Sequence, residues 1–310
     1  MKKNIKLLIL SFIILFVLIF SGCTNNSAEK SLINSDNNKD LILTNFYPTY
    51  DITKNIVGDN FDIAVLIPIG VDPHSFQLSP REIVKYSNAK IFITMGGMFS
   101  IQENKFINSN NNNKMVIIDS TKNLNYSNYY NFTKLSNENI NDVNPHIWLS
   151  FDFMIEMTKT ITNGLIKKYP NKKEEIEKGE FRYLNKLEEL KLDYKKGLSN
   201  CKYNKIIVNH EAYSYLSKDY NFSQITISGF SPQSEPSPNA LKKVIDTAKR
   251  FGLKYVFVEA NLDKKTSETI TNDIGGKVLE LNPIISSKNE SYFDLMENNL
   301  KNLKLGLACK

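Results

Sequence analysis

The chain has 310 residues, a formal net charge of +6 and only three histidines. This length suits one large domain or two medium-sized domains with sizeable hydrophobic cores. Three of the positive charges, on Lys2, Lys3 and Lys6, lie in an N-terminal segment that we expect to be removed. The remaining excess of positive charge is small, and no cluster of Lys or Arg is interleaved with aromatic residues. The composition therefore excludes a nucleic-acid-binding protein.

The N-terminus has the pattern of a secretory signal. A positive start at residues 1–3 precedes an almost unbroken apolar run at 7–20, which is short for a membrane-spanning helix. Two small residues then precede Cys23, as in bacterial lipoprotein signals, in which the cysteine carries lipid. We predict a lipoprotein signal peptide over residues 1–22 with lipidation of Cys23; a plain N-terminal membrane anchor is the alternative. Residues 23–40 are rich in Asn, Ser and Asp and predict a flexible tether.

Residues 41–169 predict an N-terminal α/β lobe. Short apolar runs predict strands at 41–44, 61–67, 90–94 and 115–118. Helices are predicted at 50–57, from Ser79 onward and at 151–169. In the second of these, Ser79 suits the helix cap, Pro80 the first helical position and Glu82 the first turn. Strands that alternate with helices in this way form parallel βα units.

The polar segment 120–144 breaks this alternation. It contains several Tyr and Phe residues but no regular period, and we predict a long surface loop that delivers His146. Residues 171–200 instead place apolar side chains at steps of three or four, which predicts a helix about 40 Å long. We interpret residues 170–200 as a rigid helix that joins two lobes; a solvated helix within one lobe is the alternative. Gly179 inside this helix is expected to cost roughly 1 kcal/mol.

Residues 201–310 predict a second, C-terminal α/β lobe. Strands are predicted at 205–208, 225–228, 255–258 and 277–281. Helices are predicted at 238–251, 264–274 and 292–307. Cys201 and Cys309 form an even pair in a chain that we expect to be exported, which favours a disulfide between them; two free thiols are the alternative.

The three histidines occupy similar positions relative to the predicted elements. His74 and His210 follow predicted strands, as does Glu259, and His146 lies in the segment 144–148 with the only Trp. Ligands of open α/β sheets bind beyond the carboxyl ends of the strands, so these residues would meet across a cleft between two lobes. Three imidazoles with a carboxylate or water suit a tetrahedral Zn²⁺, although other first-row metals accept the same ligands.

Several motifs in this order resemble those of a known family. The matching segments are 70–76, 144–149, 209–216, 227–229 with 235–238, and 257–259. Over essentially the whole chain after the tether, the sequence resembles the bacterial zinc- and manganese-type solute-binding lipoproteins, the extracytoplasmic receptors of ABC metal importers. The resemblance implies two α/β lobes joined by a long rigid helix, with the metal held between them by His74, His146 and His210. A histidine at position 210 is similar to the zinc-type members, whereas manganese-type members have a carboxylate there.

The sequence departs from the family pattern at two places. Asn144 stands where Asp is common before Pro-His, which alters a side chain expected to support a ligand. Asn282 stands in a segment that often supplies an acidic fourth ligand. The fourth ligand is therefore expected to be Glu259, another carboxylate or water, and Glu259 is alternatively a residue that supports the ligands or a buried structural acid.

The resemblance also implies partners and a location. We expect a non-enzymatic, monomeric zinc receptor, lipid-anchored at the outer face of the cytoplasmic membrane, that passes the ion to an ABC permease. A manganese receptor of the same family is one alternative. A zinc-dependent hydrolase with an open fourth position is another, although His210-Glu211 is not extended to the two-histidine zinc protease motif. A surface adhesin that uses the tyrosines of residues 120–144 is a third.

Overall fold

The computed structural model describes residues 39–110, 112–127, 129, 144–228, 236–259, 264–285 and 290–310. The predicted signal peptide, the lipidation site at Cys23 and most of the predicted tether and loop lie outside these residues. Lys39–Lys310 forms one compact unit, so the lobe boundaries given above stay predictions. Among the described residues, no helix combines the length and apolar character needed to cross a membrane.

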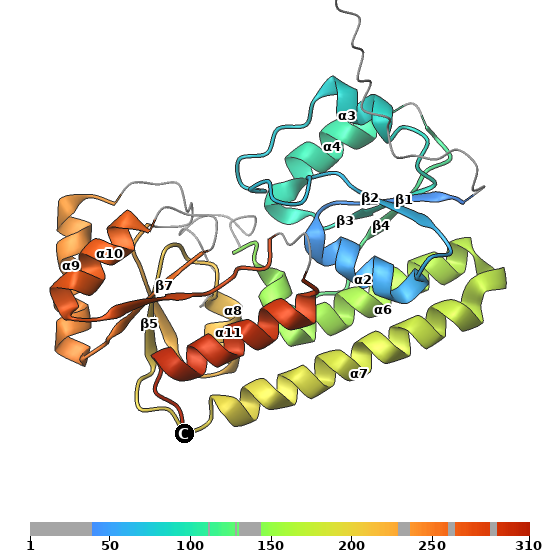
Figure 1. The fold of residues 1–310 in the computed structure, drawn as a ribbon. Helices are drawn as coiled ribbons and strands as arrows, with labels where there is room; N and C mark the ends of the chain where they lie inside the picture. Colours follow the sequence, from blue (N-terminus) through green and yellow to red (C-terminus); the bar gives the residue numbers. More distant parts are fainter. Residues whose placement is uncertain are drawn as a thin grey trace, which may run out of the picture. The chain divides into compact units, whose positions relative to one another are not determined.

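The N-terminal lobe is built on a parallel sheet with the strand order β2-β1-β3-β4. Its strands are β1 (Leu41–Thr44), β2 (Asp62–Val65), β3 (Ile91–Thr94) and β4 (Val116–Asp119). Its helices are α2 (Tyr47–Val57), α3 (Pro80–Lys85), α4 (Ser100–Ser109) and α6 (Phe151–Lys168). Figure 1 shows α3 and α4 on one face of the sheet and α2 and α6 on the other. The central strands are buried on both faces, which explains their unbroken apolar sequence.

The C-terminal lobe repeats this arrangement, with the parallel strand order β6-β5-β7-β8. Its strands are β5 (Lys205–Val208), β6 (Ser223–Thr226), β7 (Tyr255–Val258) and β8 (Lys277–Glu280). Its helices are α8 (Ser214–Asp219), α9 (Pro238–Phe251), α10 (Lys265–Ile274) and α11 (Tyr292–Gly306). The predicted fold class, two lobes of parallel βα units, is confirmed.

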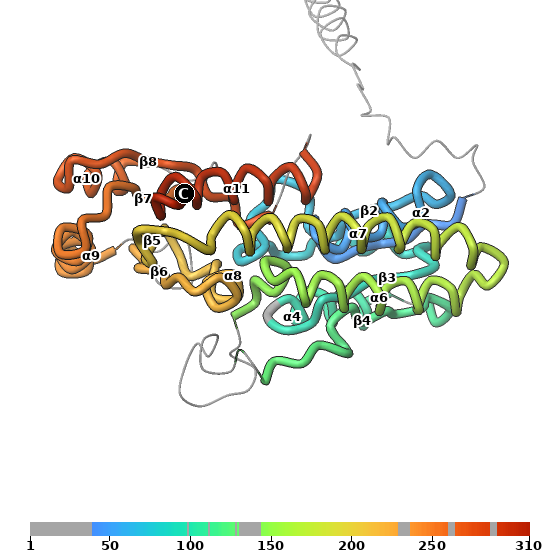
Figure 2. Tube along the Cα trace, turned by 90° about the horizontal axis from the view of Figure 1, so that it is seen from below, coloured from blue at the N-terminus to red at the C-terminus, as the bar shows by residue number. Residues whose placement is uncertain are grey.

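A long helix, α7 (Lys173–Gly197), packs on both lobes, as Figures 1 and 2 show. Its buried stripe consists of Ile176, Gly179, Tyr183, Leu187, Leu190 and Tyr194. The Tyr183 hydroxyl donates to Asp51 of α2 over 2.8 Å, and the Tyr194 hydroxyl donates to the Met296 carbonyl of α11 over 2.7 Å. The helix therefore joins the two lobes, as predicted, and one of these two tyrosines bonds to each lobe.

The start of α11 returns to the N-terminal lobe. The Tyr292 hydroxyl donates to the Trp148 carbonyl over 2.9 Å, and its backbone N–H donates to Asp51 over 3.3 Å. Asp51 thus accepts hydrogen bonds from both α7 and α11. Burial raises the pKa of this carboxyl group, and the hydrogen bonds from Tyr183 and Tyr292 oppose that rise. The lobes therefore meet at a buried, hydrogen-bonded junction.

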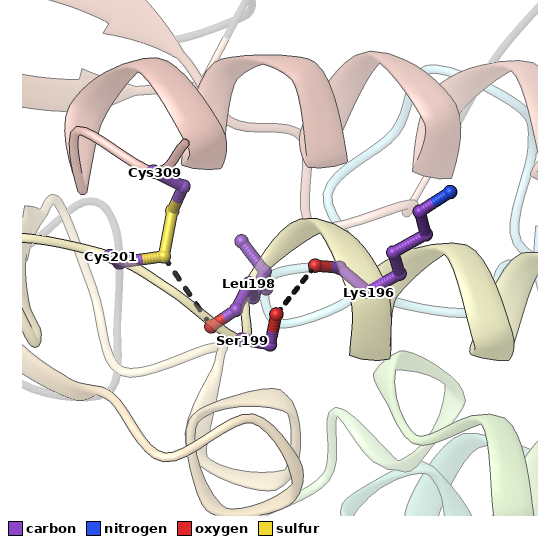
Figure 3. Close-up of a disulfide and its surroundings, with 5 residues drawn as sticks. All are labelled: Lys196, Leu198, Ser199, Cys201 and Cys309. Atoms are coloured by element: carbon purple, nitrogen blue, oxygen red, sulfur yellow. Dashed lines mark hydrogen bonds between the residues drawn. A yellow bond between two sulfur atoms is a disulfide. The ribbon is translucent and has the colours of Figure 1, made fainter.

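The far ends of α7 and α11 are also fastened to each other. Cys201 follows α7 and Cys309 follows α11, and a disulfide joins them (Figure 3). The backbone N–H groups of Lys202 and Tyr203 donate to the carbonyl groups of Ala308 and Leu307 beside this bond. The sequence left open whether these cysteines form a disulfide or two free thiols, and the structure contains the disulfide.

Gly179 is the point of closest approach between α7 and α2. A Cβ atom at this position would lie 2.1 Å from the Ile56 carbonyl oxygen. The cost expected for a helical glycine is therefore offset by the close packing of two backbones. By contrast, a Cβ atom on Gly197, at the end of the same helix, would meet only the ends of the Leu300 and Lys304 side chains, at 3.2 and 3.3 Å.

Gly179→Ala should lower the free energy of unfolding by about 3 kcal/mol, because the Ile56 carbonyl is backbone and cannot yield. Gly197→Ala is the matched control, and the helix preference of Ala should leave it neutral or up to about 1 kcal/mol more stable. Urea unfolding followed by circular dichroism measures both. Equal stability of the two variants would contradict the close approach.

Candidate metal site

The structure brings the three histidines together from three separate segments. His74 lies in the loop after β2, in a turn where its backbone N–H donates to Asp72 over 2.9 Å. His146 directly precedes the short 3-10 helix Ile147–Leu149. His210 follows β5, two residues after Val208. The parallel strands of each lobe end toward the cleft, which is why residues so distant in sequence meet.

The three rings point their Nε2 atoms at a common position. The Nε2 atom of His146 lies 3.2 Å from that of His74 and 3.1 Å from that of His210. Nitrogen ligands around a tetrahedral zinc, at Zn–N distances of 2.0–2.1 Å, would lie about 3.3 Å apart. Among the described residues, these three histidines form the set of metal-binding side chains whose ligand atoms lie close enough together to hold an ion, all within 4.8 Å of one another. Their spacing fits a zinc ion at the centre of the three nitrogens.

Asn144 fixes the orientation of His146. Its amide nitrogen donates to the Glu211 carbonyl over 2.6 Å and to the Ser214 hydroxyl over 3.1 Å, so its oxygen must face the other way. That oxygen accepts from the backbone N–H of His146 over 3.0 Å and from its Nδ1 over 2.8 Å. A proton held on Nδ1 leaves the lone pair of Nε2 free for a metal. Asn144 therefore supports this ligand as an acceptor, without the charge of the more common Asp.

Glu259 makes the corresponding contact with His210. Its Oε1 atom lies 2.6 Å from Nδ1 of His210, and both side chains are buried. A carboxylate behind an imidazole fixes the tautomer and increases the basicity of the nitrogen that faces the metal. Glu259 is not in the group of converging ligand atoms. The fourth-ligand role predicted for it stays a prediction, and the contact favours the supporting role.

Burial and mutual proximity favour the neutral form of two of the rings, those of His146 and His74. Burial lowers the pKa of His146 well below its ordinary value, and His210 and His74 lower it further. Burial also lowers the pKa of His74, which Asp72 opposes and His210 reinforces. Neutral imidazole is the form that binds metal, so these two rings are ready for a cation at neutral pH.

Several residues that support the site were not predicted from the sequence. Ser214 holds the Asn144 amide, and Gln224 in turn donates to Ser214 over 2.8 Å. The Tyr215 hydroxyl donates to the Asn144 carbonyl over 2.7 Å. The segment 209–216 was part of the family resemblance, and its polar residues were the available signal. Glu235, another residue of the resemblance, lies outside the described residues.

The two roles open to Glu259 give different results on substitution. If Glu259 supports His210, Glu259→Gln keeps an acceptor for Nδ1 and should weaken zinc binding less than about 10-fold, whereas Glu259→Ala should weaken it about 10- to 100-fold. Glu188→Gln is the control, because that carboxylate is exposed on α7, outside the contacts of the three rings. Competition with a chromogenic chelator measures the affinities. A loss much larger than 100-fold for Glu259→Gln would identify Glu259 as a ligand instead.

Zinc affinity should stay nearly constant from about pH 7.5 to about pH 6.5 and fall only at lower pH. The reference pKa of histidine is about 6.5, and the pKa values of His74 and His146 in the folded protein lie below their ordinary value. Protons therefore compete with the metal for these two ligands only at pH values lower than the reference value suggests. Chelator competition at several pH values tests this, and a tenfold loss already between about pH 7.5 and 6.5 would contradict it.

Comparison with known proteins gives a consistent result. The family model described as "Zinc-uptake complex component A periplasmic" matches residues 42–306. The chain is 30% identical over 284 residues to the zinc-binding protein AdcA of Streptococcus pyogenes serotype M6, which covers 85% of this chain and 55% of the relative. It is 29% identical over 310 residues to the high-affinity zinc uptake system protein ZnuA of Bacillus subtilis, covering 96% of this chain and 97% of the relative.

Solved structures agree with this match. The zinc-bound ZnuA-like domain of Streptococcus pneumoniae AdcA has a TM-score of 0.74 at 30% identity, covering 87% of this chain and 99% of that chain. The laminin-binding protein Lmb of Streptococcus agalactiae has a TM-score of 0.75 at 26% identity, covering 86% of this chain and 99% of that chain. The chain spans about half the length of the full AdcA relatives that it matches. Since the family model covers nearly all of the described residues, the chain belongs to the ZnuA family of zinc-uptake components.

Proposed function

We propose that this protein is an extracytoplasmic receptor that captures Zn²⁺ between its two lobes and delivers it to an ABC importer. The observation that carries the proposal is the convergence of three Nε2 atoms, with neighbouring pairs 3.1 and 3.2 Å apart. Asn144 and Glu259 hold the opposite nitrogens of two of these rings. The names of the AdcA and ZnuA relatives, which describe zinc binding and zinc uptake, support the same conclusion.

The ligand set favours zinc over manganese. All three converging atoms are imidazole nitrogens, and none of the described carboxylates joins them. Zinc accepts a tetrahedral set rich in imidazole, whereas manganese lies at the weak end of the divalent series and suits oxygen ligands. Water completes the four ligands if Glu259 acts only on His210. We therefore propose His74, His146 and His210 as the zinc ligands.

The burial of the site favours capture over hydrolysis. A catalytic zinc site keeps one position open to a substrate. Here His146 and His210 are each 1% exposed, which suits an ion that has exchanged most of its water for protein ligands. His74 is more exposed and lies in residues 66–79, which contain no helix or strand. We propose that withdrawal of this ligand opens the path for release to the permease.

The adhesin alternative has less support. The solved relative Lmb is described as a bifunctional protein with adhesin and metal-transporting activity. Of the tyrosines in residues 120–144 that suggested an adhesive surface, Tyr129 is buried and Tyr126 is half-buried against Phe153, while Tyr130 lies outside the described residues. The proposal is therefore restricted to metal capture.

We propose that Cys23 carries a lipid that holds the monomeric receptor at the outer face of the cytoplasmic membrane. The pattern of residues 7–23 supports this, as does the similarity to a zinc-binding lipoprotein AdcA of Streptococcus pneumoniae, 30% identical over 313 residues. Cys23→Ser should leave protein without lipid, either as retained precursor or released into the medium. Mass spectrometry of membrane and medium fractions decides, and a lipidated, normally processed Cys23→Ser protein would contradict the proposal.

Metal selectivity tests the assignment of the ligands. The protein should bind Zn²⁺ far more tightly than Mn²⁺. His210→Glu should reduce the difference between the two affinities, because it supplies a hard oxygen ligand. His74→Ala and His146→Ala should each weaken zinc binding by more than about 100-fold, beyond the loss typical of a supporting residue. Trp148, whose ring lies 5.2 Å from that of His146, provides a fluorescence signal for the titrations.

The exposed Asn123→Ala is the control variant and should leave both affinities unchanged, since the residue lies away from the rings and contacts Thr160. Circular dichroism checks that each histidine variant stays folded. A preference of the unmodified protein for Mn²⁺, or histidine variants with undiminished zinc affinity, would show that the site is assigned wrongly.

A further inference from the structure

The amino-terminal edge of the C-terminal sheet carries a row of lysines. Lys205 begins β5, Lys277 begins β8, and Lys254 directly precedes β7. Ile207 pairs with Val256, which sets Lys205 level with Lys254, and the Lys277 N–H donates to the Lys254 carbonyl over 2.8 Å. Adjacent strands lie about 4.8 Å apart. Lys205 and Lys254 therefore lie level on neighbouring strands and on the same face of the sheet, whereas Lys277 pairs with Tyr255 and lies at the same edge on the other face.

The end of α9 adds further positive charge to this edge. Arg250 lies 5.6 Å from the centre of the Phe251 ring, and Lys205 lies 5.0 Å from the centre of the same ring. Lys202 lies 5.0 Å from the centre of the Tyr203 ring, and the Tyr203 hydroxyl lies 3.9 Å from where a Cβ atom on Gly252 would be. The exposed Lys249 directly precedes Arg250 in α9. We call these cations the basic edge: Lys202, Lys205, Lys249, Arg250, Lys254 and Lys277.

The cations of the basic edge have no acidic partners. Within the described residues, ion pairs form on other surfaces, such as Lys242 with Asp246 and Lys178 with Glu174, but none involves the basic edge. Like charges held together without counterions repel one another and disfavour the compact state. Three of these cations, Lys202, Lys205 and Arg250, lie over aromatic rings. Each such cation–π contact contributes about 0.5–1 kcal/mol of stability when it is exposed. Lys254 donates to the Ile274 carbonyl over 3.0 Å and Lys205 to the Ser223 hydroxyl over 3.2 Å, so these two cations are held in place but not neutralised by an acidic side chain of the described residues.

The basic edge and the metal site lie at opposite ends of the same strands. His210 and Glu259 follow the carboxyl ends of β5 and β7, whereas Lys205 and Lys254 lie at their amino ends. Figure 1 shows the chain entering β5 near the C-terminus, away from the segments that follow the strands. A transporter that receives the ion at the cleft would leave the basic edge uncovered.

We propose that the basic edge binds a linear phosphate polyanion. Lysine and arginine are the usual partners of phosphate, and a row of cations along neighbouring strands suits a chain of anions. A single-stranded nucleic acid would need free aromatic faces for its bases, but Phe251 is already contacted by Lys205 and Arg250. Binding to a lipid bilayer would need several exposed apolar side chains as anchors. Among the described residues of the basic edge and its ring contacts, Phe251, which is 42% exposed, is the large apolar side chain at the surface, and a single such anchor does not favour a bilayer.

The test measures binding of long-chain inorganic polyphosphate to the full chain, kept in mild detergent and metal-free buffer. Isothermal titration at about 50 and 200 mM salt should show an affinity that falls roughly 20- to 300-fold, as expected for three to six released counterions. The triple variant Lys205→Gln, Lys249→Gln, Arg250→Gln should bind at least about tenfold more weakly and with a smaller salt dependence. Its zinc affinity should be unchanged, because these residues are not in the site.

The control triple variant is Lys114→Gln, Lys167→Gln, Lys168→Gln, which removes the same charge from exposed positions of the N-terminal lobe. It should retain the polyphosphate affinity of the unmodified protein. An equal loss in both triple variants would show a response to net charge alone and would overturn the proposal. Tighter binding of single-stranded DNA, or of vesicles that contain anionic lipid, than of polyphosphate would overturn it as well.

Discussion

Three imidazole nitrogens from two lobes can converge only if the lobes are held at a fixed separation. The helix α7 sets that separation, because Tyr183 near its middle contacts α2 and Tyr194 near its C-terminal end contacts α11. The start of α11 then closes the arrangement through Tyr292, which donates to the carbonyl of Trp148, two residues beyond His146. The position of a zinc ligand is therefore linked to the junction between the lobes by a short chain of contacts.

Polar groups buried at this junction specify one arrangement of the lobes. Asp51 is 6% exposed and its pKa is raised by burial, so its charge is costly unless the hydrogen bonds from Tyr183 and Tyr292 remain in place. The Trp148 indole N–H donates to the Pro283 carbonyl of the C-terminal lobe over 2.6 Å. A sliding motion of one lobe past the other would break these bonds in a buried region. In the proposed receptor, release of the ion would therefore depend more on the loop that carries His74 than on the junction.

Much of the fold could be predicted because periodicity and caps are local signals. β5, β7 and α9 have the predicted bounds, and Ser79 caps α3 as predicted, with Glu82 of the first turn completing a capping box. The sequence did not predict α4, whose Ile101 is 73% exposed and weakens the apolar stripe, or α8, which is only 6 residues long. The sequence also could not show why position 179 requires a glycine, because the reason is the close approach of the Ile56 carbonyl group in another helix.

The site was predictable to the level of residue type and strand position. The three histidines could be selected because they follow strands or a shared Pro-His pattern, but ring orientation could not. The role of Asn144 depends on partners 67 and 70 residues away, Glu211 and Ser214, which no local pattern specifies. Likewise, the sequence could place Glu259 beside the site but could not determine which nitrogen of His210 it would face.

X-ray absorption at the zinc edge of the zinc-loaded protein tests the central claim most directly, because it identifies the atoms that surround the ion. The account predicts three imidazole nitrogens at about 2.0–2.1 Å and one further oxygen ligand. A shell with fewer than three imidazoles, or one that contains sulfur, would contradict it.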